Sequence, residues 1–260
     1  MKGLEDVYTF AVAGDWHGDF RYACKAMAYA ARHGCEVLIQ LGDFGYYHED
    51  RYVTGLDIEA KRLGIHLLFI DGNHEHHRLL LHQPVDDDGV RRLKDRVWHL
   101  PRGYRWDWHG IKFLALGGAY SIDRTWLVPY VEWFPEETLT IEQMYRATQG
   151  GDVHVMFTHE PPNRVLIPNL NEGIAPRNEL ELAHEHQTLV GKVVDEVHAK
   201  ILWHGHMHRK YHDFRLNPIT GEKTLVKGLD MNKRPLEDNV DIVNLYDLFQ
   251  TEYGDYEAFL

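Results

Sequence analysis

Three histidines alternate with other residues in the segment ILWHGHMHRK, which spans residues 201–210. Alternate residues of a strand share one face, so this spacing alone would place His204, His206 and His208 side by side. Histidine is the commonest metal ligand in proteins, and the chain holds 19 histidines but only two cysteines. A site of imidazole, carboxylate and amide ligands with little thiolate suits Mn, Fe or Zn rather than a soft metal.

Further groups of this kind follow other short apolar runs of the chain. These runs, with the turns after them, are VYTFAVA (7–13) with GDWHGD, EVLIQL (36–41) with GDFGYY, IHLLFI (65–70) with DGNHEHH, and VHVMFTHE (153–160). The first three alternate with helical patterns over 20–34 and 53–64, which predicts βαβ units and a buried parallel sheet. Ligands of such sheets bind beyond the carboxyl ends of the strands. The residues expected at that edge are Asp15, His17, Asp43, Asn73, His74, His159, His206 and His208.

These motifs are evidence for a metal site because they are found together. Each one alone is weak evidence, because Gly-Asp often follows a parallel strand in proteins that bind no metal. Five motifs at equivalent strand ends predict a metal site. The eight groups exceed the needs of one ion and fit two ions that share a bridging carboxylate.

The rest of the chain is predicted to continue the α/β class within one domain, residues 1–260. The expected elements are hairpin strands over 97–120, a short helix over 140–151, a strand ending at Thr158-His159, a long helix over 178–199, a hairpin around 218–221 and a strand over 240–246. No linker, repeat or low-complexity segment interrupts them.

Composition limits the class of partner. The formal net charge is −12, from 28 Lys+Arg against 40 Asp+Glu, which argues against stable binding of duplex DNA. The basic run of residues 91–96 is interpreted as a solvated face. Cys24 and Cys35 are interpreted as free structural thiols of a reducing compartment. The N-terminus lacks a signal-peptide pattern and no apolar run is long enough for a bilayer, so we expect a cytoplasmic protein without membrane contact.

The ordered motifs GDWHG (14–18), GD (42–43), GNHE (72–75), TH (158–159) and GHMH (205–208) resemble those of the calcineurin-like metallophosphoesterase superfamily. The resemblance implies a four-layer α/β/β/α sandwich that holds a dinuclear metal centre. The expected ions are two divalent cations, with Mn favoured over Fe, Ni or Zn.

The resemblance also assigns a role to each motif residue. Asp15, His17 and His208 would hold the first ion, Asn73, His159 and His206 the second, and Asp43 would bridge them. A hydroxide shared by the two ions would attack phosphorus in line. His74 would protonate the leaving oxygen as general acid, and Glu75 would orient His74. His204 receives no ligand role and is left as a supporting or core residue.

Sequence differences from one branch of the superfamily narrow the class of possible substrates. Ser/Thr protein phosphatases carry Gly-Asp-x-x-Asp-Arg-Gly and Arg-Gly-Asn-His, whereas this chain has Tyr46 and Tyr47 in place of that Asp-Arg pair and Asp71 in place of the second arginine. Two phosphate-binding arginines are therefore missing. A monoester dianion would profit most from them, so their absence favours phosphodiesters.

Two further segments, GGAYSIDRTW (117–126) and EWFPEE (132–137), resemble small bacterial and bacteriophage metallophosphoesterases, a branch with enzymes that act on cyclic nucleotides. Arg124 could reach a phosphate or pair with a surface carboxylate. Tyr46 and Tyr47, with Trp126 and Trp133, could stack on a base or belong to the core.

The favoured function is a phosphodiesterase for small nucleotides, with 2′,3′-cyclic nucleotides among the candidate substrates. The alternatives are a DNA or RNA nuclease of the same chemistry, a protein or nucleotide phosphomonoesterase, and a non-catalytic, metal-stabilised binding protein. The presence of His74 argues against the last. The pattern leaves the oligomeric state open.

Overall fold

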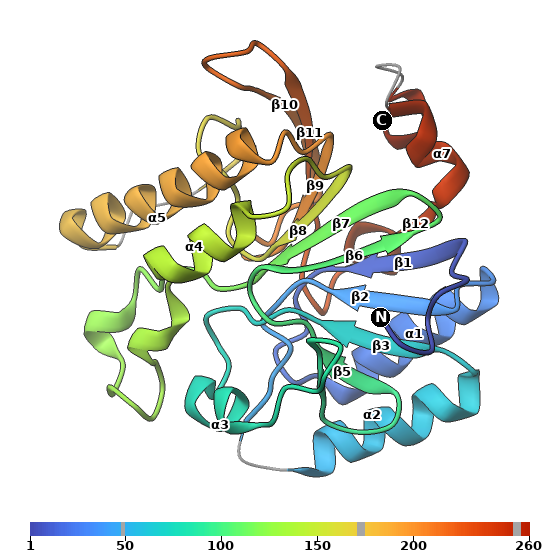
Figure 1. Ribbon diagram of the computed structural model, residues 1–260. Coiled ribbons are helices and arrows are strands. Elements are labelled where there is room, and N and C mark those ends of the chain that lie inside the picture. Colours follow the sequence, from blue (N-terminus) through green and yellow to red (C-terminus); the bar gives the residue numbers. More distant parts are fainter. Residues whose placement is uncertain (48–49, 171–174, 252–255) are drawn as a thin grey trace.

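Two six-stranded sheets pack face to face, with helices on both outer sides (Figure 1). The computed structural model describes residues 1–47, 50–170, 175–251 and 256–260. The predicted four-layer α/β/β/α sandwich is confirmed. Within the described ranges, none of the helices combines the length and the apolar composition needed to cross a bilayer.

The first sheet has the strand order β12-β1-β2-β3-β5-β4. Its strands are β1 (Thr9–Ala13), β2 (Val37–Gln40), β3 (His66–Phe69), β4 (Arg91–Arg92), β5 (Val97–His99) and β12 (Val240–Asn244). Strands β1, β2, β3 and β5 run parallel, and β12 and β4 close the two edges in the antiparallel sense. The three predicted βαβ strands therefore lie in neighbouring positions, with their carboxyl ends at one edge.

Helices α1 and α2 cover the outer face of the first sheet. The helices of this half are α1 (Phe20–Arg32), α2 (Asp50–Leu63) and α3 (His77–His82), and α6 (Leu236–Asn239) and α7 (Leu245–Gln250) flank β12. Helix α1 begins after Asp19, whose side chain accepts a hydrogen bond from the backbone N–H of Tyr22. Its buried stripe includes Ala23, Ala26 and Met27. The small alanines allow this helix to approach the sheet closely.

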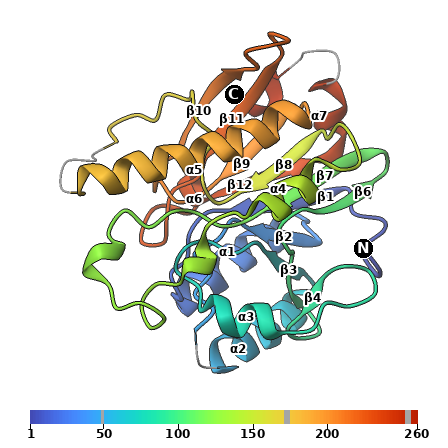
Figure 2. The same ribbon diagram turned by 60° about the vertical axis from the view of Figure 1, so that its left-hand side comes forward.

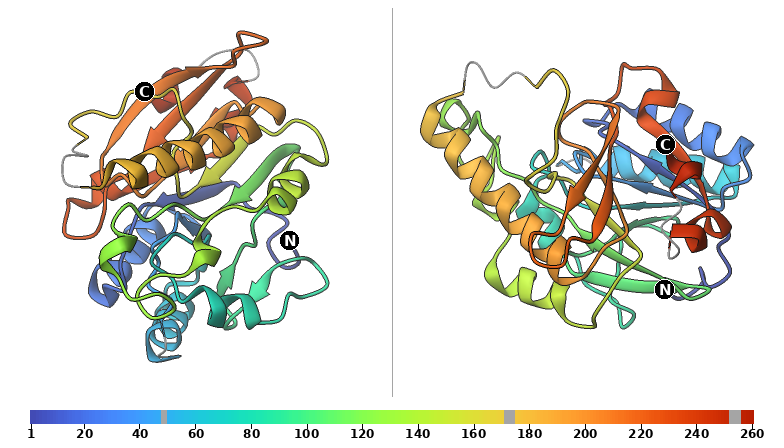
Figure 3. Two further views of the ribbon diagram at one scale, coloured as in Figure 1. Left: turned by 90° about the vertical axis from the view of Figure 1, so that its left-hand side faces the viewer. Right: turned by 90° about the horizontal axis from the view of Figure 1, so that it is seen from above.

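The second sheet has the order β10-β11-β9-β8-β7-β6. Its strands are β6 (Tyr104–Trp108), β7 (Ile111–Leu116), β8 (Val155–Thr158), β9 (Ile201–His204), β10 (Tyr211–Leu216) and β11 (Lys223–Gly228). Helices α4 (Ile141–Thr148) and α5 (Arg177–Glu196) cover its outer face (Figure 2). Seen from above, α5 and α1 lie on opposite outer sides of the molecule (Figure 3). Short 3₁₀ turns occur at Arg124–Trp126, Pro135–Glu137 and Glu257–Phe259.

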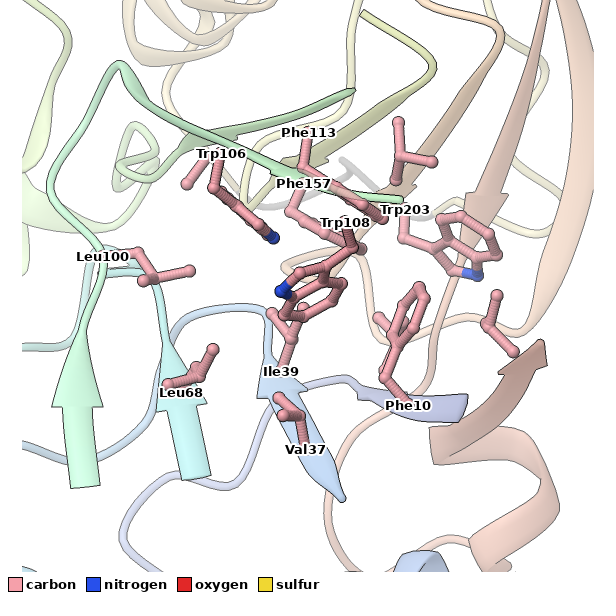
Figure 4. Packing of buried hydrophobic residues seen from close by; sticks show 14 of the residues in the cluster. Phe10, Val37, Ile39, Leu68, Leu100, Trp106, Trp108, Phe113, Phe157 and Trp203 are labelled. Atoms are coloured by element: carbon pink, nitrogen blue, oxygen red, sulfur yellow. The ribbon is translucent and has the colours of Figure 1, made fainter. Parts of the chain in front are cut away.

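An aromatic core fills the space between the sheets. Phe10 and Ile39 of the first sheet face Trp106, Phe113 and Phe157 of the second (Figure 4). The Phe113 and Phe157 rings are stacked with their centroids 6.1 Å apart. Because residues on both faces of the central strands are buried, these strands read as unbroken apolar runs, as is typical of parallel sheets covered on both sides.

Two predicted elements differ from the structure. The hairpin strands expected over 97–120 are divided between the sheets, because β5 pairs in parallel with β3 while β6 and β7 form the hairpin of the second sheet. The strand expected over 240–246 ends at Asn244. The side chain of Asn244 accepts a hydrogen bond from the backbone N–H of Tyr246 and begins α7. The helix cap at Asn244 therefore ends the strand, although the apolar alternation of the segment continues beyond it.

Candidate metal centre

Two sets of potential ligands meet between the carboxyl ends of the two sheets. In the described chain, the first set is Asp15, His17, Asp43 and His208, and the second is Asp43, His159 and His206. Within each set the ligand atoms lie within 4.8 Å of one another. Asp43 belongs to both sets. The Oδ1 atom of Asn73 lies beside the second set, 3.1 Å from Nε2 of His159. The structure therefore brings together all seven residues that the family resemblance implies as ligands.

The backbone around Asp43 explains its central position. Asp43 follows β2 in the left-handed conformation, with a φ of 51°. Its Oδ1 atom accepts hydrogen bonds from the backbone N–H groups of Asn73 (3.0 Å) and His74 (2.9 Å). Its Oδ2 atom lies 3.4 Å from Nε2 of His17. Two backbone donors thus hold the carboxylate so that it faces both sets.

Left-handed backbone recurs among the candidate ligands. His17, His206 and His208 have φ values of 47°, 64° and 50°. Non-glycine residues adopt this conformation at an energetic cost, and such residues gather at functional sites. The neighbouring Gly205 is required for a steric reason, because a Cβ atom there would lie 2.2 Å from Oδ1 of Asp15.

The ring orientations of two histidines suit metal binding. Nδ1 of His159 lies 2.7 Å from the carbonyl oxygen of Leu41, and Nδ1 of His17 lies 3.0 Å from Oδ1 of Asn232. An N–H on each Nδ1 atom would donate to these oxygens, which leaves Nε2 free for an ion. Both Nε2 atoms face Asp43.

His208 supplies a test of whether a cation fits here. Its Nε2 atom is buried and makes no hydrogen bond to the described residues, although it lies 2.9 Å from Oδ2 of Asp15. Imidazole nitrogens and carboxylate oxygens are both ligands that divalent metals accept. A cation between the imidazole and the carboxylate would satisfy both groups, so the residues present fit divalent metal ions.

Comparisons with known proteins agree with this geometry. The family model for calcineurin-like phosphoesterases matches residues 8–210. The chain belongs to the calcineurin-like phosphoesterase family. Membership implies metal-dependent hydrolysis of phosphoesters in general.

Two solved structures are similar to this phosphoesterase at low sequence identity. The crystal structure of TT1561 of Thermus thermophilus is 10% identical, with a TM-score of 0.49 over 92% of this chain and 99% of that chain. The crystal structure of a hypothetical protein from the same organism is 14% identical, with a TM-score of 0.44 over 86% of this chain and 76% of that chain. No curated protein matches the sequence.

The electrostatics of the phosphoesterase site reflect its buried carboxylates. Burial would lower the pKa of His17, but its contact with Asp43 and the charge of Asp15 raise that pKa to about 9. Burial likewise opposes the charge on His159, but Asp43 and Asp15 raise its pKa to about 10. Burial would raise the pKa of Asp43, yet His159 and His74 hold it well below its usual range. The carboxylates therefore attract cations strongly.

A hydrogen-bond chain that the sequence analysis missed fixes Asn73. Its Nδ2 atom donates to Oγ of Ser121 (3.0 Å), and the Ser121 hydroxyl donates to Oε2 of Glu137 (2.8 Å). Glu137 is fully buried, and burial raises its pKa to about 7. Because Nδ2 is engaged, Oδ1 of Asn73 is the atom directed at the second set. Ser121 lies in the segment 117–126 and Glu137 in the segment 132–137. The resemblance of these two segments to small phosphoesterases was the signal that could have pointed to both residues.

Asn232 was missed for a different reason. It lies in the loop after β11, far from every motif in sequence. Its backbone N–H donates to the carbonyl oxygen of Asp15 (2.8 Å), and this contact brings its side chain to the His17 ring. Nothing in the residue types around it distinguishes this asparagine from one in an ordinary turn.

Asp71, which stands where the phosphatase branch has an arginine, is buried. Its Oδ2 atom accepts hydrogen bonds from Nε (2.8 Å) and Nη2 (2.6 Å) of Arg102, and Nε2 of His99 lies 3.1 Å from its Oδ1. Arg102 also donates to the backbone carbonyls of Thr138 and Glu137. This arginine is therefore a structural bridge between loops.

Glu75 lies under the site. Its carboxylate accepts hydrogen bonds from the backbone N–H groups of Gly45 (3.1 Å) and Gly72. These contacts join the loops that carry Asp43 and Asn73. Among the described contacts none joins Glu75 to the His74 ring, so the predicted role of orienting His74 stays a prediction.

The predicted substrate contacts occupy varied environments. Arg124 pairs with Glu179 (2.8 Å) and lies over the Tyr120 ring, which matches the alternative of a carboxylate partner. Tyr46 is partly buried against the core under α1 and α2. Tyr47 is exposed, and its ring lies next to Gly18 in the turn after His17.

His204 contributes to the core beneath the site. Its ring is fully buried, with Nδ1 2.8 Å from the carbonyl oxygen of Gly205 and Nε2 2.6 Å from the Tyr211 hydroxyl. Burial lowers its pKa to about 4. Its imidazole is therefore neutral and supports the turn that carries the ligands.

Proposed function

We propose that the protein is a metal-dependent phosphodiesterase that acts on small nucleotides, with 2′,3′-cyclic nucleotides among the substrates. The observation that carries this proposal is that His208 lines two separate hollows. One, of about 470 Å³, is lined by residues that include His17, Asn232 and Lys233. The other, of about 270 Å³, is lined by His206 and by apolar side chains. A phosphodiester has two organic groups, and this site has room for both.

In this proposal the seven ligands would hold two divalent cations, and Asp43 is the residue that belongs to both ligand sets. Bound divalent cations would neutralise phosphoryl oxygens and supply an activated water. His74 would donate a proton to the leaving oxygen. Its backbone N–H is held by Asp43, and its ring centroid lies 6.1 Å from that of His17. The imidazole is therefore placed beside the first ligand set.

The charge of the surroundings supports a diester over a monoester. The guanidinium groups of Arg102 and Arg124 are engaged by Asp71 and Glu179. The second negative charge of a monoester dianion would gain nothing from these two arginines. A substrate with a single phosphate charge fits better.

Manganese is the proposed metal, because the donors are carboxylate, amide and imidazole groups. A reducing cytoplasm is the proposed compartment, because both thiols are free. Duplex DNA is not a proposed partner. The net charge is −12, and Arg92 of the basic run is paired with Asp86 and Asp88.

The test is an activity panel on the purified protein with Mn, Ni, Zn and Mg. The substrates are bis-p-nitrophenyl phosphate, p-nitrophenyl phosphate, 2′,3′-cyclic nucleotides, linear dinucleotides, and labelled single- and double-stranded DNA. We expect Mn-dependent hydrolysis of the small diesters well above that of the monoester. Strong monoesterase activity without diesterase activity would refute the proposal, and preferred cleavage of DNA would favour the nuclease.

A variant separates catalysis from metal binding. His74→Asn should lower kcat by about 10²–10⁴-fold, the usual contribution of a general acid. Metal content, measured by elemental analysis, should not change, because the His74 ring is outside both ligand sets. Unchanged turnover would show that His74 is not the acid.

A further inference from the structure

A pocket between α5 and the turn after β9 opens directly onto the candidate metal centre. We name it the α5 pocket. It encloses about 270 Å³, and its lining includes His206 and His208, one from each ligand set. Pockets for drug-sized ligands are roughly 300–1,000 Å³. The α5 pocket is therefore the size of one substituent of a substrate that is anchored at the metals.

Apolar side chains form much of its wall. Ile122, Leu180, Ala183 and Met207 line it. The other hollow that His208 lines contains charged side chains in its wall, Asp19 and Lys233, beside Met231. The two hollows therefore differ in their charged residues, with a lysine in the wall of one and a buried glutamate in the wall of the other.

The polar groups of the α5 pocket disfavour a second anion. Glu160 lines it, and its buried carboxylate accepts hydrogen bonds from the backbone N–H of Tyr120 (3.0 Å) and from Nε2 of Gln187 (3.2 Å). Nδ1 of His186 lies 3.2 Å from the same carboxylate. An anionic substituent would meet this carboxylate, and the described lining of the pocket contains no lysine or arginine. A neutral substituent avoids the repulsion and gains from burial.

We infer that the α5 pocket binds the neutral, apolar organic group that stays on phosphorus when the ester is cleaved. The inference rests on the proposed phosphodiesterase function and names which ester group this part of the site selects. The leaving group must lie near the general acid. His74, the proposed acid, does not line the α5 pocket and lies against His17 of the first ligand set. Because the leaving group lies near His74, the group that occupies the α5 pocket is the one that stays on phosphorus.

Two synthetic diesters test this inference. Phenyl p-nitrophenyl phosphate and methyl p-nitrophenyl phosphate share the leaving group and differ only in the retained group. With Mn, the wild-type protein should prefer the phenyl diester in kcat/KM by at least about tenfold, a typical gain from an apolar pocket. Ala183→Phe should fill the pocket and Leu180→Ser should make its wall polar. Both should reduce the preference to about threefold or less, through a loss of kcat/KM for the phenyl diester.

A matched control is available on the same helix. Leu182 is half-buried like Leu180 but does not line the pocket, so Leu182→Ser should keep the wild-type preference. If Ala183→Phe unfolds at the assay temperature, Leu180→Ser decides. Equal kcat/KM for the two diesters in the wild type, or an unchanged preference in the pocket variants, would overturn the inference while the diesterase function stands. Hydrolysis of neither diester would overturn the proposed function and the inference with it.

Discussion

Replacement of Ser121 by alanine tests how the second ligand set is held together. The Ser121 hydroxyl accepts a hydrogen bond from Asn73 (3.0 Å) and donates one to Glu137 (2.8 Å). All three residues are at most 3% exposed, so water cannot replace the hydroxyl readily. In Ser121→Ala, the Asn73 amide loses the contact that directs its Oδ1 atom at the second set. We expect weaker binding of the second cation.

The magnitude follows from the number of groups left unpaired. A buried donor without an acceptor costs about 1–3 kcal/mol, and about 1.4 kcal/mol corresponds to a tenfold change in affinity. Loss of the hydrogen bond from Nδ2 of Asn73 should therefore lower the affinity of the second set for its cation by about 10–100-fold. This is the range found for residues that orient metal ligands. Ser121 makes no described contact with the first set. The first cation should keep its affinity.

The assay is a titration of the metal-free protein with Mn²⁺. Binding is measured by calorimetry and by electron paramagnetic resonance. The wild type should show two sites, and Ser121→Ala should show one site unchanged and one weakened. Thr158→Val is the matched control. The Thr158 hydroxyl is also buried, directly before His159, but has no hydrogen-bond partner among the described residues. Its removal should leave both affinities as they are.

Two results would refute this reasoning. The first is an unchanged second affinity in Ser121→Ala, which would show that Asn73 needs no orientation or is no ligand. The second is an equal loss in Thr158→Val. That result would mean that any loss of a buried hydroxyl near the site has this effect, whatever its hydrogen bonds.

Three other predictions follow from the same structure. Arg102→Met should destabilise the fold by about 3–5 kcal/mol in urea unfolding, because Asp71 would be buried without its partner; turnover per folded molecule should persist, and its loss would mean that Arg102 contacts substrate. Gly205→Ala should abolish binding of the first cation, because its methyl would lie 2.2 Å from a ligand oxygen; a folded variant with two intact sites in calorimetry would contradict this. Without metal, His17 and His159 have pKa values of about 9 and about 10, so both rings are protonated at neutral pH and each must lose a proton to bind metal. Mn²⁺ affinity should therefore rise between about pH 6 and 8 with proton release in calorimetry, and a flat profile would count against these pKa shifts.

Much of the fold and most of the site could be predicted, because both depend on local signals that repeat. Each βαβ unit shows its apolar strand, its turn and its amphipathic helix within a few tens of residues. The carboxyl ends of such strands meet by rule, so the motif residues could be placed together before any contact was known. The division of 97–120 between two sheets could not be predicted, since both β5 and β6 have the composition of ordinary strands. Which sheet a short strand joins is decided by packing against partners that are distant in sequence.

The hydrogen-bond partners of Asn73, His17 and Asp71 could not be assigned from the sequence for a related reason. Ser121, Asn232 and Arg102 each act through one or two hydrogen bonds to a residue at least 31 positions away. A single long-range contact produces no periodicity, and serine, asparagine and arginine are common in loops. Asp71 carried a partial signal, because a carboxylate in place of an arginine next to the motif predicts a partner of opposite charge. It does not say where in the chain that partner lies.

The segment ILWHGHMH shows where periodicity misleads. Strand β9 ends at His204, so the alternation that would place three histidines on one face holds for only the first. Gly205 is packed against Asp15, and the backbone then turns through left-handed conformations at both His206 and His208. His206 consequently joins His159 in the second ligand set, and His208 joins Asp15 in the first. Two residues that a strand would place side by side are thus separated by a strained turn. Such strain persists where the surroundings compensate for it, and here Nε2 of His208 is held 2.9 Å from Oδ2 of Asp15, its partner in the first ligand set.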